Sequence, residues 1–235
     1  LTAVGLEDWR AAGRIAYRDV AARAGPDRPL WVGGYSTGAT VVLLQTLETL
    51  KDPAARRPDR VLLVSPAIAL SRIAALANVV DLFGFVPGLG KARWETVRPE
   101  YDPYKYNSFP INAARQVNAA TKALHVEVAS AAAAGRIDTM PPVIAWQSVV
   151  DSTVGPTGIA DTLFARLAGA RHHLVLFDVN RTRALELVQS SGSAALIRRW
   201  IDGPRAWTLT VVGNDSPDGR KVCARRYEPG KPPIE

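Results

Sequence analysis

Short apolar runs alternate with longer amphipathic stretches along most of the 235-residue chain. Continuous apolar runs, typical of strands that are buried on both faces, cover residues 30–35, 60–65, 142–147 and 173–178. Amphipathic or apolar stretches of helical length cover residues 6–24, 38–50, 157–169 and 183–202. Strands that alternate with helices predict an α/β fold, with a mostly parallel sheet and helices on both of its faces.

Residues 67–137 interrupt this alternation. Two helical patterns there, near 67–82 and 111–134, flank a loop rich in glycine, proline and aromatic residues. We predict that this segment is a helical cap, or lid, over one edge of the sheet. The α/β core is then formed by residues 1–66 and 138–235. The strand–turn–strand pattern of residues 206–227 predicts a hairpin added late to that core.

Composition and charge exclude several classes of protein. Hydrophobic residues make up 47% of the chain and charged residues 22%, which is ordinary for a globular domain. The formal net charge is +7, but no basic cluster is interleaved with aromatic residues, so we expect no nucleic-acid partner. Arg10, Arg14 and Arg18 share one stripe of the first helix, which predicts a solvated face. The single cysteine, Cys223, fits a reducing compartment, so we expect a cytoplasmic location, with the cell envelope as the alternative.

The pentapeptide Gly34-Tyr35-Ser36-Thr37-Gly38 is the strongest chemical signal. An apolar strand runs directly into this G-x-S-x-G pattern and an apolar helix leaves it, which is the setting that a nucleophile elbow requires. Side chains in place of Gly34 or Gly38 are expected to collide with the strand or the helix. The backbone N–H of Thr37 points where an oxyanion would form. Ser36 is therefore the predicted nucleophile, and the alternative is a tight turn in another kind of α/β protein.

A serine nucleophile needs a base, and the base needs an orienting acid. In enzymes with this elbow the order along the chain is serine, then acid, then histidine. Asp151 follows the predicted strand at 142–147 and is the predicted acid. The alternative role for Asp151 is to cap the following helix, in which case Asp178 is the substitute acid.

At this point the chain resembles the α/β-hydrolase superfamily over nearly its whole length. It is most similar to bacterial serine esterases and lipases of the monoacylglycerol-lipase type. The resemblance rests on Leu6-Glu7-Asp8-Trp9 at a helix start, on the pentapeptide, on the cap-like insertion and on residues 147–154. It implies an α/β-hydrolase fold and hydrolysis of carboxylic esters through an acyl-enzyme on Ser36. We expect neither a cofactor nor a metal.

Two features depart from that family pattern. Such hydrolases have eight strands with the elbow after the fifth, so we expect the early strands and the loop with the second oxyanion donor to lie outside this chain. The family places its base after the strand at 173–178, where this chain has no histidine. His125, His172 and His173 are expected to be packed or surface residues, and the base is expected beyond Glu235.

The predicted partner is a small acyl or aryl ester, because ligand pockets are mostly apolar and the cap segment is rich in apolar and aromatic residues. Asn180 and Arg181 are expected to border the pocket, but neither can act as the base. Membrane association is expected only through sequence outside this chain. The alternative function is a catalytically inactive α/β-hydrolase that binds a ligand or a protein. An envelope-associated structural protein is a third interpretation, which rests on the positive charge alone.

Overall fold

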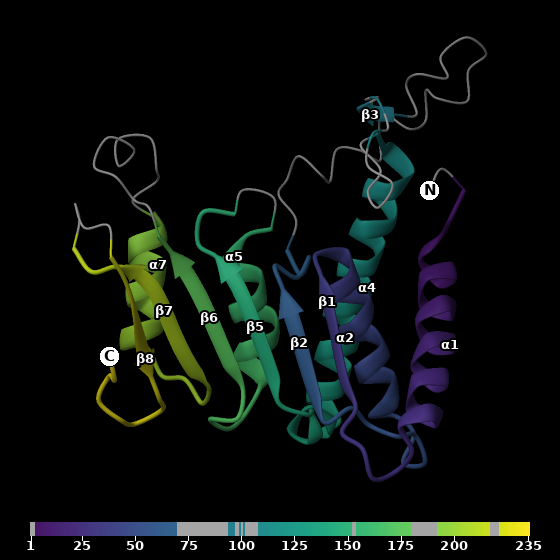
Figure 1. Ribbon diagram of the computed structural model, residues 1–235, viewed down its shortest axis with the longest axis horizontal. Helices are drawn as coiled ribbons and strands as arrows, with labels where there is room; N and C mark the ends of the chain where they lie inside the picture. Colours follow the sequence, from purple (N-terminus) through teal and green to yellow (C-terminus); the bar gives the residue numbers. More distant parts are fainter. Residues whose placement is uncertain are drawn as a thin grey trace.

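The computed structural model describes residues 3–69, 94–96, 99, 101, 108–151, 154–179, 192–216 and 221–235. At its centre lies a six-stranded sheet in the order β1-β2-β5-β6-β7-β8 (Figure 1). Its strands are β1 (Trp31–Tyr35), β2 (Arg60–Val64), β5 (Val143–Ser148), β6 (His173–Asp178), β7 (Thr208–Asn214) and β8 (Val222–Tyr227). All neighbouring pairs are parallel except β7 and β8. The predicted α/β class with a mostly parallel sheet is confirmed.

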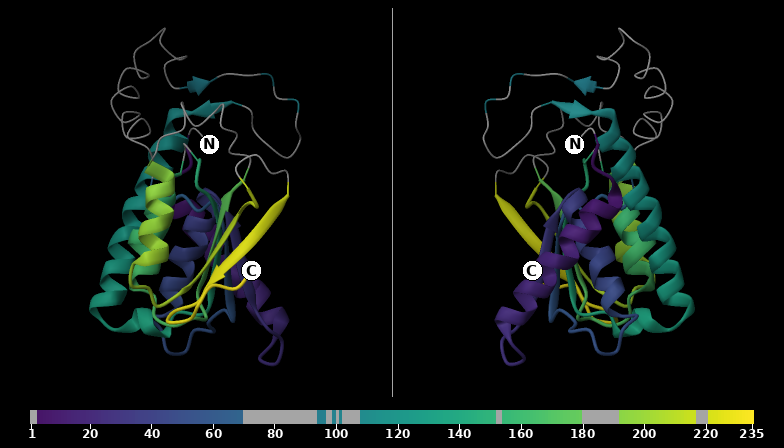
Figure 2. Two further views of the ribbon diagram at one scale, coloured as in Figure 1. Left: turned by 90° about the vertical axis from the view of Figure 1, so that its left-hand side faces the viewer. Right: turned by 90° about the vertical axis from the view of Figure 1, so that its right-hand side faces the viewer.

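One face of the sheet is covered by helices (Figure 2). The covering elements are α2 (Thr37–Thr49), α4 (Ile111–Ala133), α7 (Gly192–Asp202) and α5 (Pro156–Gly158), which continues in irregular helical turns to Arg166. Leu63, Ala145 and Leu174 lie at the centre of three neighbouring strands and are completely buried under this layer. The main hydrophobic core therefore lies between the sheet and these helices.

The opposite face of the sheet is open in the described part of the chain. Trp31 is 57% exposed and Tyr35 is 70% exposed, and Val64 and Phe177 on β2 and β6 are exposed as well. These side chains alternate along their strands with less exposed ones, because successive residues of a strand point to opposite faces. The helical cover predicted for this second face is not found among the described residues.

The second half of α4 belongs to the core and not to the predicted cap. Leu124 and Val128 are completely buried, and the core also includes Ile137 beyond the end of this helix. The apolar stripe of α4 packs on α2, which covers the sheet. Burial of this stripe therefore places α4 in the helical layer of the core. Near the other end of α4, a two-stranded sheet pairs β3 (Trp94–Thr96) with β4 (Phe109–Pro110), where the sequence predicted only helices and a loop. The remainder of the predicted cap, including most of its first helix, lies outside the described residues.

The predicted hairpin is present as the antiparallel pair β7 and β8, and β7 also pairs in parallel with β6, so the hairpin extends the main sheet. α1 (Leu6–Ala24) lies beside β1 at the edge of the sheet and buries none of its residues fully (Figure 1). Among its apolar side chains, Leu6 packs against the core, while Ile15 is 71% exposed. None of the described helices combines the length and the apolar character needed to cross a membrane.

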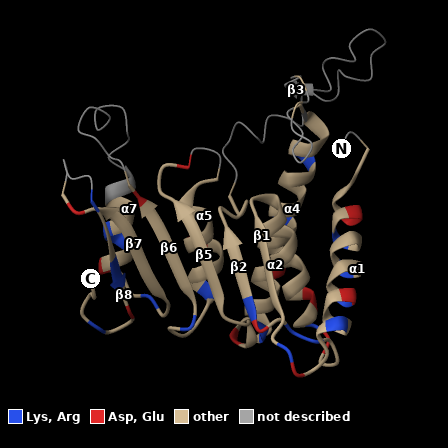
Figure 3. Ribbon diagram, viewed as in Figure 1, with Lys and Arg blue, Asp and Glu red and all other residues tan. Residues whose placement is uncertain are grey.

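The arginine stripe of α1 is only partly solvated. Charged side chains are dense on α1 and sparse on the strands of the sheet interior (Figure 3). The Arg10 and Arg14 guanidinium groups both form ion pairs with Glu48 on α2. These ion pairs help to hold α1 against α2, and they partly bury a stripe that the sequence predicted to be solvated.

Candidate active site

Ser36 occupies a sharp turn between β1 and α2. Its backbone has φ 52° and ψ −121°, a left-handed conformation that is strained for a residue with a side chain. The Ser36 N–H donates to the Val64 carbonyl at 2.9 Å, and the Ser36 carbonyl accepts from the Ala39 N–H at 3.1 Å. These bonds hold the turn to the end of β2 and to the first turn of α2.

The two glycines that flank Ser36 have different roles. A Cβ atom on Gly34 would lie 2.5 Å from the Gly38 carbonyl carbon and from the Ala39 nitrogen, both of them backbone atoms. A Cβ atom on Gly38 would meet no described atom within 4 Å. The collision expected from the sequence therefore occurs at Gly34 and not at Gly38. The reason is that the backbone of Gly38 and Ala39 passes directly over Gly34.

Ser65 is a residue of this region that the sequence analysis missed. It follows β2 directly and has φ 43°, the same unusual region of backbone conformation as Ser36. It also precedes Pro66, and a residue before proline normally adopts an extended conformation. The next residues are anchored on the serine turn, because the Ala67 N–H donates to the Ser36 carbonyl at 3.2 Å. A serine at the end of a buried apolar run was the available sequence signal.

Two hydroxyl groups from different helices hold Ala67 in place. The Thr40 hydroxyl on α2 donates to the Ala67 carbonyl at 2.8 Å, and the Thr121 hydroxyl on α4 donates to the same oxygen at 3.0 Å. Both threonines are buried. The segment after β2 is therefore fixed between the Ser36 turn and the two core helices.

Asp151 lies in the turn after β5 and is partly buried. Its Oδ1 atom accepts a hydrogen bond from the Val154 N–H at 2.9 Å. Its Oδ2 atom lies 3.3 Å from the Gln147 amide nitrogen, which is a donor. Asp151 therefore does not cap α5, whose N-cap residue is Gly155. The carboxylate instead closes a turn of its own.

Strand direction places these groups at one edge of the sheet. β1, β2 and β5 are adjacent and parallel, so their carboxyl ends, which precede Ser36, Ser65 and Asp151, lie side by side (Figure 1). β2 separates the other two strands, and neighbouring strands lie about 4.8 Å apart. Ligands of open parallel sheets bind outside these carboxyl ends.

None of the three histidines, all of which the structure describes, forms a hydrogen bond with Ser36. His172 and His173 stand at the start of β6, which is the opposite edge of the sheet. The His125 Nε2–H donates to the Ile68 carbonyl at 2.7 Å from α4. Ile68 lies next to Ala67, so His125 is the histidine whose hydrogen bond lies nearest to the serine turn along the chain.

The other predicted site residues are placed as follows. Thr37 is the first residue of α2, and N–H groups in a first helical turn have no partner within the helix. Asp178 is the last residue of β6 and is partly buried. Asn180 and Arg181 lie outside the described residues, so their relation to the site stays a prediction. No group of three or more metal-ligating side chains is found among the described residues.

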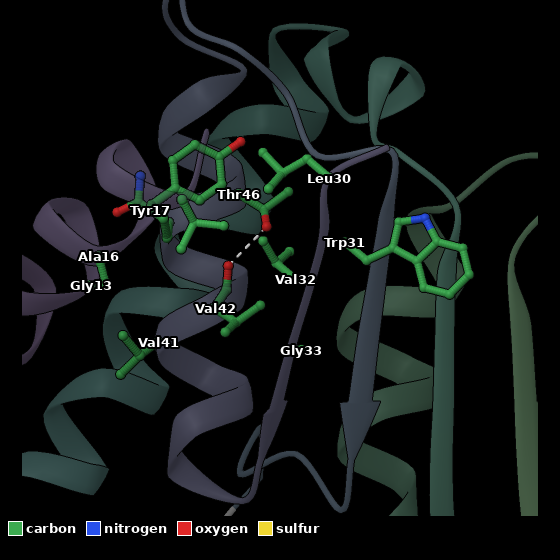
Figure 4. A pocket seen from close by; sticks show the side chains of 12 residues that line it. Gly13, Ala16, Tyr17, Leu30, Trp31, Val32, Gly33, Val41, Val42 and Thr46 are labelled. Atoms are coloured by element: carbon green, nitrogen blue, oxygen red, sulfur yellow. Dashed lines mark hydrogen bonds between the residues drawn. The ribbon is translucent and has the colours of Figure 1, made fainter. Parts of the chain in front are cut away.

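A cavity of about 270 Å³ lies away from these residues. It is formed between α1, α2 and the outer edge of β1, and Tyr17, Val32 and Thr46 point into it (Figure 4). Trp31 borders it, but its ring points away (Figure 4). The lining includes neither Ser36 nor Asp151, so this cavity does not provide the ester pocket predicted from the sequence.

Comparison with known proteins gives similarity to solved structures alone. No protein-family model and no curated protein matches the chain. A crystal structure of Paleococcus ferrophilus monoacylglycerol lipase is similar with a TM-score of 0.48 and 21% identity, covering 74% of this chain and 65% of that one. A soluble variant of monoglyceride lipase from Saccharomyces cerevisiae, in complex with a substrate analog, has a TM-score of 0.45 and 14% identity, covering 73% and 58%. The chain thus spans less than two thirds of the length of either structure.

Proposed function

We propose that this chain carries the nucleophile of a serine hydrolase of the α/β-hydrolase type that cleaves carboxylic esters. The observation that supports this most is the strained conformation of Ser36 in a strand–turn–helix setting, with φ 52° and ψ −121°. Strain at a residue other than glycine persists only where the surroundings impose it, and it concentrates at functional sites. Gly34 contributes to this geometry, since any side chain there would strike the turn.

The proposed reaction has two stages. The Ser36 Oγ attacks the ester carbonyl carbon, the alcohol leaves with a proton, and an acyl-enzyme remains. Water then attacks the acyl carbon, the bond to Oγ breaks, the carboxylic acid leaves, and Oγ regains a proton. The Thr37 N–H stabilises the oxyanion in both stages. Asp151 is proposed to orient the base that takes the Ser36 proton. A small acyl or aryl ester is the proposed substrate class.

A catalytically inactive binding module is the second candidate function. It is favoured by one observation, which is that none of the described histidines 125, 172 and 173 forms a hydrogen bond with Ser36. An unactivated serine hydroxyl is a weak nucleophile. The two candidates therefore differ in the reactivity of one oxygen atom.

A fluorophosphonate probe separates the two functions. It is expected to label Ser36 in the full-length protein and to leave Ser36→Ala unlabelled, while Ser130→Ala, which removes an exposed hydroxyl of α4, keeps full labelling. Turnover of short p-nitrophenyl esters is expected to fall in Ser36→Ala by as much as the order of 10⁶-fold known for a triad nucleophile, with the fold intact. A full-length protein that is neither labelled nor active on esters would support the inactive module.

A further inference from the structure

A buried glutamine near the end of β5 contacts the proposed acid. Gln147 is 1% exposed, and its Nε2 atom lies 3.3 Å from Asp151 Oδ2 and 3.1 Å from the Val154 carbonyl oxygen. We propose that Gln147 is a positioning residue that fixes the Asp151 carboxylate at the Ser36 edge of the sheet. This inference rests on the proposed function, because it assigns a task to the amide only if Asp151 is the orienting acid.

The three residues form a closed ring of hydrogen bonds. The Val154 N–H donates to Asp151 Oδ1, the Val154 carbonyl accepts from Gln147 Nε2, and the same amide group reaches Asp151 Oδ2. Both carboxylate oxygens are thereby held by donors. The ring therefore restricts the orientation of the carboxylate.

The chemistry around Gln147 sets the orientation of its amide. The Ser148 carbonyl oxygen also lies 3.3 Å from Nε2, so the nitrogen faces three acceptors. Exchanging the amide oxygen and nitrogen would place an acceptor against these acceptors. The Oε1 atom is buried and has no hydrogen-bond partner among the described residues. A buried acceptor without a hydrogen bond destabilises the folded state. The Oε1 atom therefore favours replacement by an apolar side chain of similar size, and only the hydrogen bonds of Nε2 favour an amide at this position.

The substitution Gln147→Met tests this role, because methionine has a similar volume and lacks the donor and the unpaired acceptor. We expect kcat for a p-nitrophenyl ester to fall roughly 10- to 100-fold, with KM within about twofold, because a displaced catalytic group loses rate and not binding. The melting temperature is expected to stay the same or to rise. A purely structural role predicts the reverse, which is an unchanged kcat and a lower melting temperature.

Gln116→Met is the matched control. Gln116 on α4 accepts a hydrogen bond from the Leu6 N–H at 2.8 Å and joins α1 to the core layer. This variant is expected to lower the melting temperature and to leave kcat unchanged. Equal effects of the two variants on kcat would contradict a specific role for Gln147.

A double-mutant cycle with Asp151→Asn tests whether Gln147 acts through Asp151. In the Asp151→Asn background, Gln147→Met is expected to cause no further loss of kcat. Losses that multiply would overturn the proposal, since the two residues would then act independently.

The failure of the proposed function can be recognised separately. If the full-length wild-type protein neither reacts with the fluorophosphonate probe nor hydrolyses esters, the serine hydrolase proposal fails. The positional claim is then tested by amide hydrogen exchange at Val154, measured by NMR in the full chain. Exchange is expected to be faster in Gln147→Met than in wild type, and an unchanged rate would overturn the positioning role.

Discussion

Polar residues differ in exposure between two sides of the central sheet: the carboxyl edge, where the parallel strands end, and the amino edge, where they begin. At the carboxyl edge, Ser36 and Asp151 lie in turns, are partly buried, and are held by hydrogen bonds to neighbouring backbone groups. At the amino edge, His172 is 1% exposed and is packed between strands. The carboxyl edge thus leaves these polar side chains partly accessible, and the amino edge buries His172.

The amino edge keeps its histidines neutral. His172 Nδ1 accepts a hydrogen bond from the Val143 N–H at 3.2 Å, and Nε2 lies 3.3 Å from the Arg171 Nε donor, so both ring nitrogens face donors, which disfavours a protonated ring. Burial, together with the charge of Arg171, lowers the pKa of His172 to about 4. Burial is also the main cause that lowers the pKa of His173, whose Nε2 lies 2.8 Å from the Thr210 hydroxyl oxygen. Both rings therefore act as uncharged packing and hydrogen-bonding groups.

The comparison shows that residue type alone does not mark a catalytic group. A histidine, a serine and an aspartate occur in this chain in numbers that would allow a triad. Strand direction assigns them to edges, because parallel strands all begin at one edge and end at the other. The position of a polar residue relative to its strand is thus more informative than its identity.

The largest effect that would test this comparison is expected for Asp151→Asn. If the carboxyl edge is catalytic, kcat/KM for a p-nitrophenyl ester falls by about 10⁴-fold, because the base loses its orienting carboxylate. Asp178→Asn, at the end of β6, is the matched variant and is expected to stay within about threefold of wild type. If the loss follows Asp178 instead, Asp178 is the acid and the role of Asp151 is wrong.

A smaller effect is expected for the glycines of the serine turn. Gly34→Ala places a Cβ atom 2.5 Å from backbone atoms, so we expect a loss of about 3 kcal/mol or more in the free energy of unfolding. Gly38→Ala meets open space and is expected to change stability by less than about 1 kcal/mol. Urea denaturation measures both variants. Equal losses would mean that the turn is not as tight as the structure has it.

The smallest effect is expected at the amino edge and depends on pH. The pKa of His172 is 6.5 in the unfolded chain and about 4 in the folded one, so acid favours unfolding. Its contribution to stability is complete above pH 6.5 and is lost as the pH falls to about 4, by up to about 3 kcal/mol.

The variant His172→Asn retains an acceptor for Val143 and cannot titrate. Compared by urea denaturation at about pH 7.5 and pH 4.5, it is expected to lose less stability in acid than wild type does. Its esterase activity is expected to equal that of wild type. A loss of ester turnover in this variant would show that the amino edge takes part in catalysis, and the contrast between the two edges would fail.

The sequence by itself predicted the parts of the molecule that depend on neighbouring residues. The apolar runs of β1, β2, β5 and β6 and the helical stretch of α1 were all recognised, because their periodicity is local. The serine turn was recognisable for the same reason, since its glycines, strand and helix are contiguous. The placement of Asp151 after a parallel strand also needed only the order of elements.

The tertiary structure alone decided the features that depend on contacts between distant segments. The amphipathic pattern of α4 fits a helix of a cap as well as a helix of a core. Only its packing on α2 places Leu124 and Val128 in the core. The parallel pairing of β7 with β6 and the open second face of the sheet likewise have no local signal. The Gln147 contact with Asp151 spans only four residues, yet it requires the turn geometry that burial of Gln147 imposes. Local pattern determines which elements form, and long-range packing determines what each side chain meets.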